Sequence, residues 1–158
     1  MQFLIMAVFA VLVVAVDQLV KFWTVSNIAL HEQIPAIEGL FRLTYVQNTG
    51  AAFSAFRGAQ WLFILVFAVL TVALVYEYFF KQLPFTKWER WCIAAVYGGG
   101  IGNVIDRIRL GYVVDMIEVE FMNFAVFNVA DIFITCACVL LMVHLILFNK
   151  TFWKEEKK

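Results

Sequence analysis

Charge is scarce in this sequence. Only 15% of the 158 residues are Asp, Glu, Lys or Arg, 64% are hydrophobic, and the formal net charge is zero. Soluble domains contain about 45–50% apolar residues, and so few charges do not cover the surface of a soluble globule of this size. The lack of a basic surplus also excludes nucleic acid as a partner, because phosphate binding needs positive charge. The composition predicts an integral membrane protein, and the length predicts a single membrane domain over residues 1–158.

Histidine and cysteine are scarce as well. The chain has two histidines, His31 and His144, and three cysteines, none of them in a CxxC or HExxH pattern. A serine or cysteine nucleophile normally needs a nearby base, most often histidine, and the cysteines lie in apolar runs away from His31. His31 lies in the predicted outer loop, whereas His144 lies near the cytoplasmic end of the fourth predicted helix. We therefore expect no Ser-His or Cys-His site, no metal and no cofactor.

Four stretches are long and apolar enough to be membrane-spanning helices, which need about 20 residues each. They are residues 2–23, 60–80, 88–107 and 127–148. The first is predicted to be a retained span, because it lacks the basic start of a signal peptide and continues through Asp17 and Lys21. We expect an all-α integral membrane protein with four transmembrane helices, and extracytoplasmic segments at 24–59 and 108–126.

The distribution of basic residues predicts the orientation. Lys81, Lys87 and Arg90 lie in the short loop between the second and third helices, and four lysines lie in the tail after the fourth. Because lysine and arginine are enriched in cytoplasmic loops, both termini are predicted to be cytoplasmic. This orientation puts Asp17, Asp115 and Asp131 near the outer face.

The first extracytoplasmic segment carries a strand pattern. Residues 41–48, FRLTYVQN, alternate apolar and polar side chains and are rich in β-branched and aromatic residues. Turn residues follow at 48–50, and residues 51–53 are predicted to form a return strand. Residues 111–123 alternate weakly and fit either a further strand or a short amphipathic element. A small β-sheet on the outer membrane surface is the expected result.

The third helix combines glycines with a polar face. Gly98 and Gly102 form a GxxxG pattern, which lets a neighbouring backbone approach closely in a membrane. Asn103, Asp106 and Arg107 follow at i, i+3 and i+4 and so share a face. This arrangement fits either the wall of an active cavity or a packing seam with a satisfied polar cap. The GGGIGN stretch is not read as a phosphate loop, because it lies inside a helix and does not follow a strand.

Asp17 and Lys21 share a face of the first helix at i, i+4. Two interpretations stay open. Either they form an ion pair at the helix end, with the lysine side chain reaching to the membrane interface, or they take part in binding a substrate.

Asp115 and Asp131 are the candidate catalytic residues. Asp115 follows the third helix and Asp131 lies in the first turns of the fourth, so an antiparallel helix pair returns them to the same depth. Two aspartates that face one water molecule share a proton, because like charges at about 3 Å cannot both ionise cheaply. One then acts as general base on water, and the other polarises a peptide carbonyl. Membrane aspartates also occur in ion-coupled transporters, and a non-catalytic assembly factor is a third possibility, although it leaves the pair unexplained.

Five motifs together carry a resemblance to a known family. They are DQLVK at 17–21, NTGAAF at 48–53, GGGIGNVIDR at 98–107, VVDM at 113–116 and FNVAD at 127–131. In this order they resemble the type II signal peptidases, the lipoprotein signal peptidases, over essentially the whole chain. One departure is Met116, where the family more often has phenylalanine.

The resemblance implies an aspartic endopeptidase of the bacterial plasma (inner) membrane, and we expect the protein to work as a monomer. Its substrates would be prolipoproteins, cleaved just before a cysteine that already bears diacylglycerol, with membrane lipids around the site. Asp115 and Asp131 would be the catalytic pair. The residues implied to line the substrate pocket, with the last two close by, are Asn48, Gly50, Asn103, Arg107, Asn128, Ala130, Asp17 and Lys21.

Overall fold

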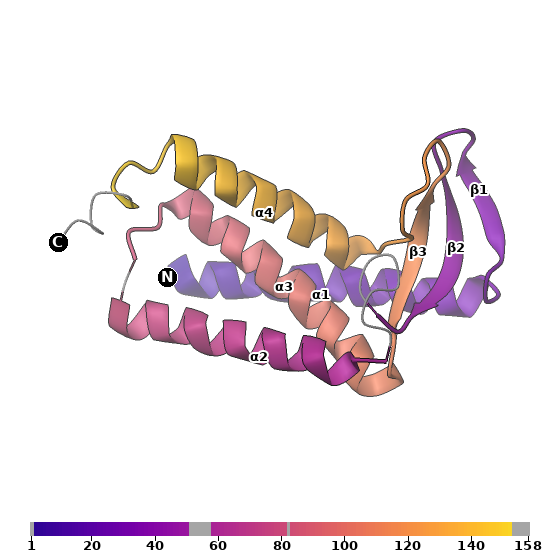
Figure 1. Ribbon diagram of the computed structural model, residues 1–158, viewed down its shortest axis with the longest axis horizontal. Coiled ribbons are helices and arrows are strands. Elements are labelled where there is room, and N and C mark those ends of the chain that lie inside the picture. Colours follow the sequence, from indigo (N-terminus) through magenta and orange to yellow (C-terminus); the bar gives the residue numbers. More distant parts are fainter. Residues whose placement is uncertain (1, 51–57, 82, 153–158) are drawn as a thin grey trace.

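The protein is a helical bundle with a small β-sheet at one end. The computed structural model describes residues 2–50, 58–81 and 83–152. In chain order the elements are α1 (Gln2–Asn27), β1 (Gln33–Ile37), β2 (Phe41–Asn48), α2 (Gln60–Tyr76), the π-helical turn η2 (Glu77–Lys81), α3 (Lys87–Leu110), β3 (Val113–Val119) and α4 (Val129–Leu147). The helices run alongside one another, and α1 begins and α4 ends at the end of the bundle opposite the sheet (Figure 1).

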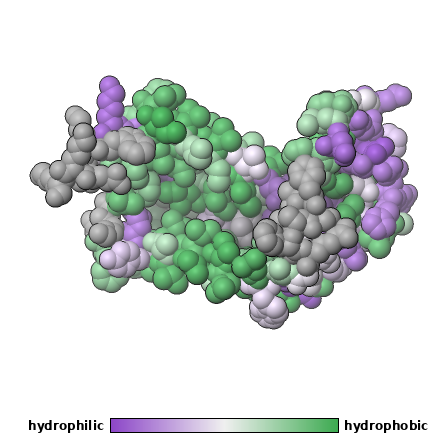
Figure 2. Space-filling model, in the orientation of Figure 1, coloured by the Kyte–Doolittle hydropathy of each residue, from purple (hydrophilic) through white to green (hydrophobic). Residues whose placement is uncertain are grey.

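Three helices in the described part of the chain are long and apolar enough to cross a membrane. They are Phe3–Asn27, Gln60–Phe80 and Val129–Leu147, with mean hydropathies of 2.6, 2.3 and 2.4. Figure 2 shows hydrophobic residues over the helices and hydrophilic residues gathered at the sheet. The predicted span 88–107 lies inside α3, which is not among the three, because glycines and polar side chains replace apolar ones along it.

The helix ends differ by a few residues from the prediction. The first helix continues past residue 23 to Asn27. The fourth begins at Val129, later than predicted, because Asn128 has an extended backbone and caps the helix: its side chain accepts a hydrogen bond from the backbone N–H of Asp131. Such a reciprocal cap satisfies N–H groups that have no partner within the helix. The third helix ends at Gly111, whose φ of 79° suits glycine.

The sheet has three antiparallel strands in the order β1-β2-β3. The predicted strand at residues 41–48 is confirmed as β2, and β3 confirms the strand interpretation of residues 111–123. The predicted return strand at 51–53 lies outside the described residues, whereas β1, which the sequence analysis missed, pairs with β2 on its other side. In this register Val46 of β2 pairs with Asp115 of β3, so the C-terminal end of β2 lies beside the start of β3.

A small apolar core joins the sheet to the end of α1. Ile28, Tyr45, Val114 and Met116 are all buried and form one cluster. Val114 and Met116 flank Asp115 on β3, and an isolated bridge pairs Ile117 with Phe127, just before α4. This packing fixes β3 between α1 and the start of α4, and so fixes the position of Asp115.

Glycines let α3 approach both neighbouring helices. A Cβ atom on Gly98 would lie 2.8 Å from the carbonyl oxygen of Ala10 in α1, and one on Gly99 would lie 2.7 Å from that of Ala130 in α4. Distances under 3.0 Å are not compatible with a side chain there. The close-packing role predicted for the GxxxG pattern is therefore present in the structure, and it brings the polar face of α3 against α1 and α4.

Candidate active site

Asp115 is a carboxyl group buried between two amide donors. Its side chain lies on β3 and is 1% exposed. Asn48 Nδ2 donates to Asp115 Oδ2 at 2.9 Å, and Asn128 Nδ2 donates to Asp115 Oδ1 at 2.6 Å. Burial raises the pKa of Asp115 to about 7, with the negative charge of Asp131 adding to the rise and the two amides partly offsetting it.

Asp131 lies in the first turn of α4 and is half-buried. Its Oδ2 accepts a hydrogen bond from the backbone N–H of Asn128 at 3.2 Å, as part of the helix cap. Its Oδ1 accepts from Asn103 Nδ2 of α3 at 2.8 Å. Helix capping therefore fixes where this carboxylate lies, and α3 supplies the amide that orients it.

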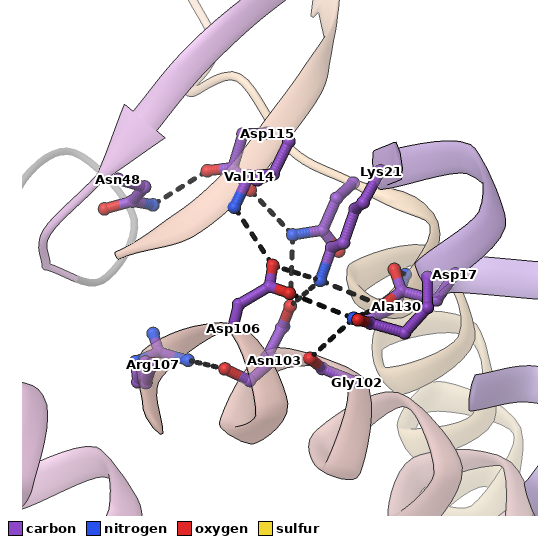
Figure 3. Close-up of polar contacts among 12 residues, drawn as sticks. Asp17, Lys21, Asn48, Gly102, Asn103, Asp106, Arg107, Val114, Asp115 and Ala130 are labelled. Carbon is purple, nitrogen blue, oxygen red and sulfur yellow. Dashed lines mark hydrogen bonds and ion pairs between the residues drawn. The ribbon is translucent and has the colours of Figure 1, made fainter. Parts of the chain in front are cut away.

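Two asparagine amides connect the aspartate pair (Asp115 and Asp131). Asn128 donates to Asp115 through Nδ2, and its Oδ1 accepts from the backbone N–H of Asp131 at 3.0 Å. The same Nδ2 also donates to Asn103 Oδ1 at 3.2 Å. The structure thus brings close together residues that the sequence analysis selected, and Figure 3 shows three of them, Asn48 of β2, Asn103 of α3 and Asp115 of β3.

Lys21 and two further aspartates form a buried ionic cluster beside the pair. Lys21 Nζ lies 2.9 Å from Asp17 Oδ2 and 3.0 Å from Asp106 Oδ2, with exposures of 3%, 0% and 3% for the three side chains. The ion pair predicted between Asp17 and Lys21 is present, but the lysine is buried and does not reach to an interface, because α1 continues beyond it and Asp106 of α3 accepts from its ammonium.

This ionic cluster also ties the surrounding elements together. Asp17 Oδ1 accepts from the backbone N–H of Ala130 at 3.0 Å, and Asp106 Oδ2 accepts from that of Val114 at 3.1 Å. Gln18 Nε2, which the sequence analysis missed, donates to Asp106 Oδ1 at 3.0 Å. A glutamine in an apolar run carries no signal of its own, and only the approach of α3 reveals its role.

Arg107 of α3 lies one turn after Asn103 and is partly buried. Its guanidinium donates to the carbonyl oxygens of Asn103 and Gly50 at 3.3 and 3.2 Å, and lies 4.6 Å from the centre of the Phe63 ring. Its buried Nε has no hydrogen-bond partner among the described residues. Gly50 in turn donates its backbone N–H to Asn48 Oδ1 at 2.9 Å, which links Arg107 to the amide that contacts Asp115.

Histidine lies away from the aspartate pair. His144 Nδ1 contacts Glu89 Oε1 at 2.8 Å, near the ends of α3 and α4 opposite the sheet. Glu89 Oε2 accepts from Asn149 Nδ2 at 2.7 Å, so this second polar cluster has its own partners. Among the described residues, no group of three or more His, Cys, Asp or Glu side chains is arranged to hold a metal ion.

These features define a class of protein: a mostly helical membrane protein in which two aspartates, each accepting hydrogen bonds from asparagine amides, lie beside a small sheet. The family model for Signal peptidase (SPase) II matches residues 9–147. The chain is 46% identical over 146 residues to a lipoprotein signal peptidase of Streptococcus pyogenes serotype M2, and 45% identical to that of serotype M1; in each case the match covers 92% of this chain and 91% of the relative. The chain belongs to the signal peptidase II family and is a peptidase.

Solved structures agree with this assignment. A bacterial membrane enzyme determined at 2.3 Å by the in meso method is 28% identical, with a TM-score of 0.82, covering 94% of this chain and 89% of its own. A second, at 1.9 Å, is 29% identical, with a TM-score of 0.77 and 93% coverage of both chains. Together with the apolar helices, these matches identify a bacterial membrane protein.

Proposed function

We propose that the chain is an aspartic endopeptidase that removes signal peptides from diacylglyceryl-modified prolipoproteins, cutting before the lipidated cysteine, with Asp115 and Asp131 as catalytic residues. The observation that carries the catalytic assignment is the amide bridge: Asn128 contacts both carboxyl-bearing residues, and Asp115 has a pKa of about 7. A pair with a proton to share near neutral pH supports acid and base chemistry together.

In the proposed reaction the aspartate pair begins with one proton. The ionised carboxylate takes a proton from a water molecule while the water oxygen attacks the scissile carbonyl carbon, and the protonated carboxyl donates to the carbonyl oxygen. The gem-diol then collapses: the nitrogen of the lipidated cysteine takes a proton from one carboxyl, the C–N bond breaks, and the other carboxylate accepts a hydroxyl proton. The pair again has one proton, so the cycle is balanced.

The remaining predicted pocket residues divide by their contacts. Asn48, Gly50 and Arg107 form a hydrogen-bonded group, and the unpartnered Nε of Arg107 supports a role in binding the substrate backbone. Asn103, Asn128 and Ala130 lie deeper, and the amides of the two asparagines contact the aspartate pair. We propose that these line the base of the pocket.

We further propose that residues 1–158 form one membrane domain with four transmembrane helices, in which α3 spans the membrane together with α1, α2 and α4. Close packing of Gly98 and Gly99 against α1 and α4 supports this, because it places α3 inside the bundle. Lys87 and Arg90 at the start of α3 favour cytoplasmic termini. In that orientation the sheet and the site lie at the outer face of the membrane. A reporter fused after Lys158 should be active only in the cytoplasm, and activity outside the cell contradicts the orientation.

The lipid part of the substrate is proposed from the family and from the surface. Apolar residues on α1, α2 and α4 are exposed around the bundle, as membrane lipids require. A site at the sheet end would let the acyl chains of a lipidated cysteine stay in the bilayer while the scissile bond meets water. We propose that the protein works as a monomer in contact with membrane lipids.

Peptide cleavage tests the proposal. Purified protein is incubated with a signal peptide that carries a diacylglyceryl cysteine and with the same peptide lacking the lipid. Cleavage of the lipidated peptide before the cysteine is expected, and it should be lost in Asp115→Asn and in Asp131→Asn, because asparagine keeps the shape but not the proton. Glu118→Gln is the matched control on β3, since Glu118 pairs with Arg42 away from the site.

Two results would contradict the proposal. Undiminished cleavage by either asparagine variant would remove that residue from the catalytic pair. Equal cleavage of the unlipidated peptide would remove the lipid from recognition. The ion-coupled transporter alternative predicts ion flux in proteoliposomes without cleavage, and the family assignment gives it no support.

A further inference from the structure

Lys21 is a buried cation that makes three short contacts. Its Nζ contacts Asp17 Oδ2 at 2.9 Å, Asp106 Oδ2 at 3.0 Å and Asn103 Oδ1 at 2.8 Å. An ammonium has three N–H donors and no acceptor. Three acceptors therefore use all of its donors, and none remains for a substrate.

The third of these contacts determines which way the Asn103 amide faces. Its oxygen and nitrogen have opposite roles: Oδ1 accepts from Lys21 Nζ, and Nδ2 donates to Asp131 Oδ1. With the amide reversed, its oxygen would face the Asp131 carboxylate and its N–H groups would face an ammonium, and neither contact is a hydrogen bond. Asn128 also donates to Asn103 Oδ1, but at 3.2 Å and without a formal charge.

We propose that Lys21 is a positioning residue for the catalytic pair: its ammonium fixes the amide of Asn103 so that an N–H group, and not an oxygen, faces Asp131. This role rests on the proposed catalytic function of Asp115 and Asp131, but it is distinct from substrate binding. Asp17 and Asp106 then have a definite purpose, because they hold the ammonium in place through α1 and α3.

The ammonium also acts on the aspartate pair through its charge. It favours ionisation of Asp115, opposing the effect of burial. The charged groups around this carboxyl and around the ammonium come from every neighbouring element: Asp131 of α4, Arg107 and Asp106 of α3, and Lys21 and Asp17 of α1. Removing the Lys21 charge leaves a more negative surrounding, so the pair should lose its proton at a higher pH.

Kinetics of three variants test the positioning role. Lys21→Met should lower kcat about 10-fold or more, leave KM within about threefold, and shift the alkaline limb of the kcat–pH profile upward by about 0.5–1 unit. Lys21→Arg keeps the charge, so its alkaline limb should stay in place, while its planar fork, unable to reproduce three contacts around one nitrogen, lowers kcat. Lys87→Met, an exposed lysine at the other end of the bundle, should change neither quantity.

Asn103→Asp gives a second test of the positioning role, which does not require the Lys21→Met protein to fold. An aspartate keeps the contact with Lys21 but presents an oxygen to Asp131, as the reversed amide would. It should lower kcat at least about 100-fold with a small change in KM. Undiminished kcat in Asn103→Asp, or an increase in KM alone in either Lys21 variant, overturns the proposal.

Failure of this role and failure of the proposed function give different results. Cleavage by Asp115→Asn in the same assay would refute the catalytic pair itself. If Asp115→Asn is inactive while both Lys21 variants keep the wild-type kcat and pH profile, only the role of Lys21 is wrong.

Discussion

Asn48 gives a direct way to change the protonation of the proposed catalytic pair. Its Nδ2 donates to Asp115 Oδ2 at 2.9 Å, and this hydrogen bond lowers the pKa of a carboxyl that burial raises to about 7. A hydrogen bond to a charged group contributes about 1.5–3 kcal/mol, and one pKa unit corresponds to about 1.4 kcal/mol. Asn48→Ala should therefore raise the pKa of Asp115 by roughly 1–2 units.

The sign of the effect is visible in the pH dependence of cleavage. In the proposed mechanism the pair contains one proton, so activity should fall on the alkaline side when that proton is lost. Removing an amide that favours the ionised form delays this loss. The alkaline limb of the kcat–pH profile should move from about 7 to about 8–9, while the maximal rate falls because Asp115 loses a positioning contact.

The assay compares cleavage of the lipidated peptide between pH 5 and pH 10 in one detergent. Asn27→Ala is the matched control, because the Asn27 amide is exposed and donates to the carbonyl oxygen of Trp23, away from the site. It should leave the profile unchanged. An alkaline limb that stays in place or moves down in Asn48→Ala refutes the assignment of this limb to Asp115.

Three further predictions concern stability in detergent. The melting temperature of Asp115→Asn, relative to that of the wild type, should be higher at pH 8 than at pH 4. The folded pKa of Asp115 is raised from 3.8 to about 7, so folding binds a proton and the wild-type protein loses stability as the pH rises through that window. An equal difference at both pH values contradicts this. Asp106→Asn should lower the melting temperature, because losing one partner of a buried ion pair costs about 3–5 kcal/mol. Glu118→Gln, from a partly exposed pair, is the comparison. Gly102→Ala should destabilise by about 1–3 kcal/mol, since its Cβ would collide with Asp17 Oδ2, and an unchanged melting temperature would mean that α1 and α3 can separate there.

Local signals predicted much of this fold. The β-branched and aromatic residues at 41–48 gave the limits of β2, although burial along the strand does not alternate, since the adjacent Thr44 and Tyr45 are both buried. Asn128 followed by Asp131 three residues later has the spacing of a reciprocal helix cap, a signal that the sequence analysis did not use when it began this helix at residue 127. By contrast, β1 is exposed along its whole length and contains a proline, so no alternation marks it.

Contacts between elements could not be predicted in the same way. The sequence places Asp106 next to Arg107, yet adjacent residues on a helix point in different directions, and Asp106 pairs with Lys21 of α1. That pairing depends on how closely α3 approaches α1, which the glycines permit but do not specify. The candidate pair was identifiable from its motifs, whereas the cluster that orients it required the structure.

The distribution of charge explains why the pair can keep a proton near neutral pH. Lys21, a full positive charge, contacts Asp17 and Asp106, while the aspartate pair receives its hydrogen bonds from the neutral amides of three asparagines. An ammonium in direct contact with Asp115 would lower its pKa by about 1–3 units, and this carboxyl would then lose its proton below neutral pH. Amides orient the carboxyl groups at a smaller electrostatic cost. An active site that needs one carboxyl and one carboxylate at the same pH is therefore better served by asparagine than by lysine at these positions.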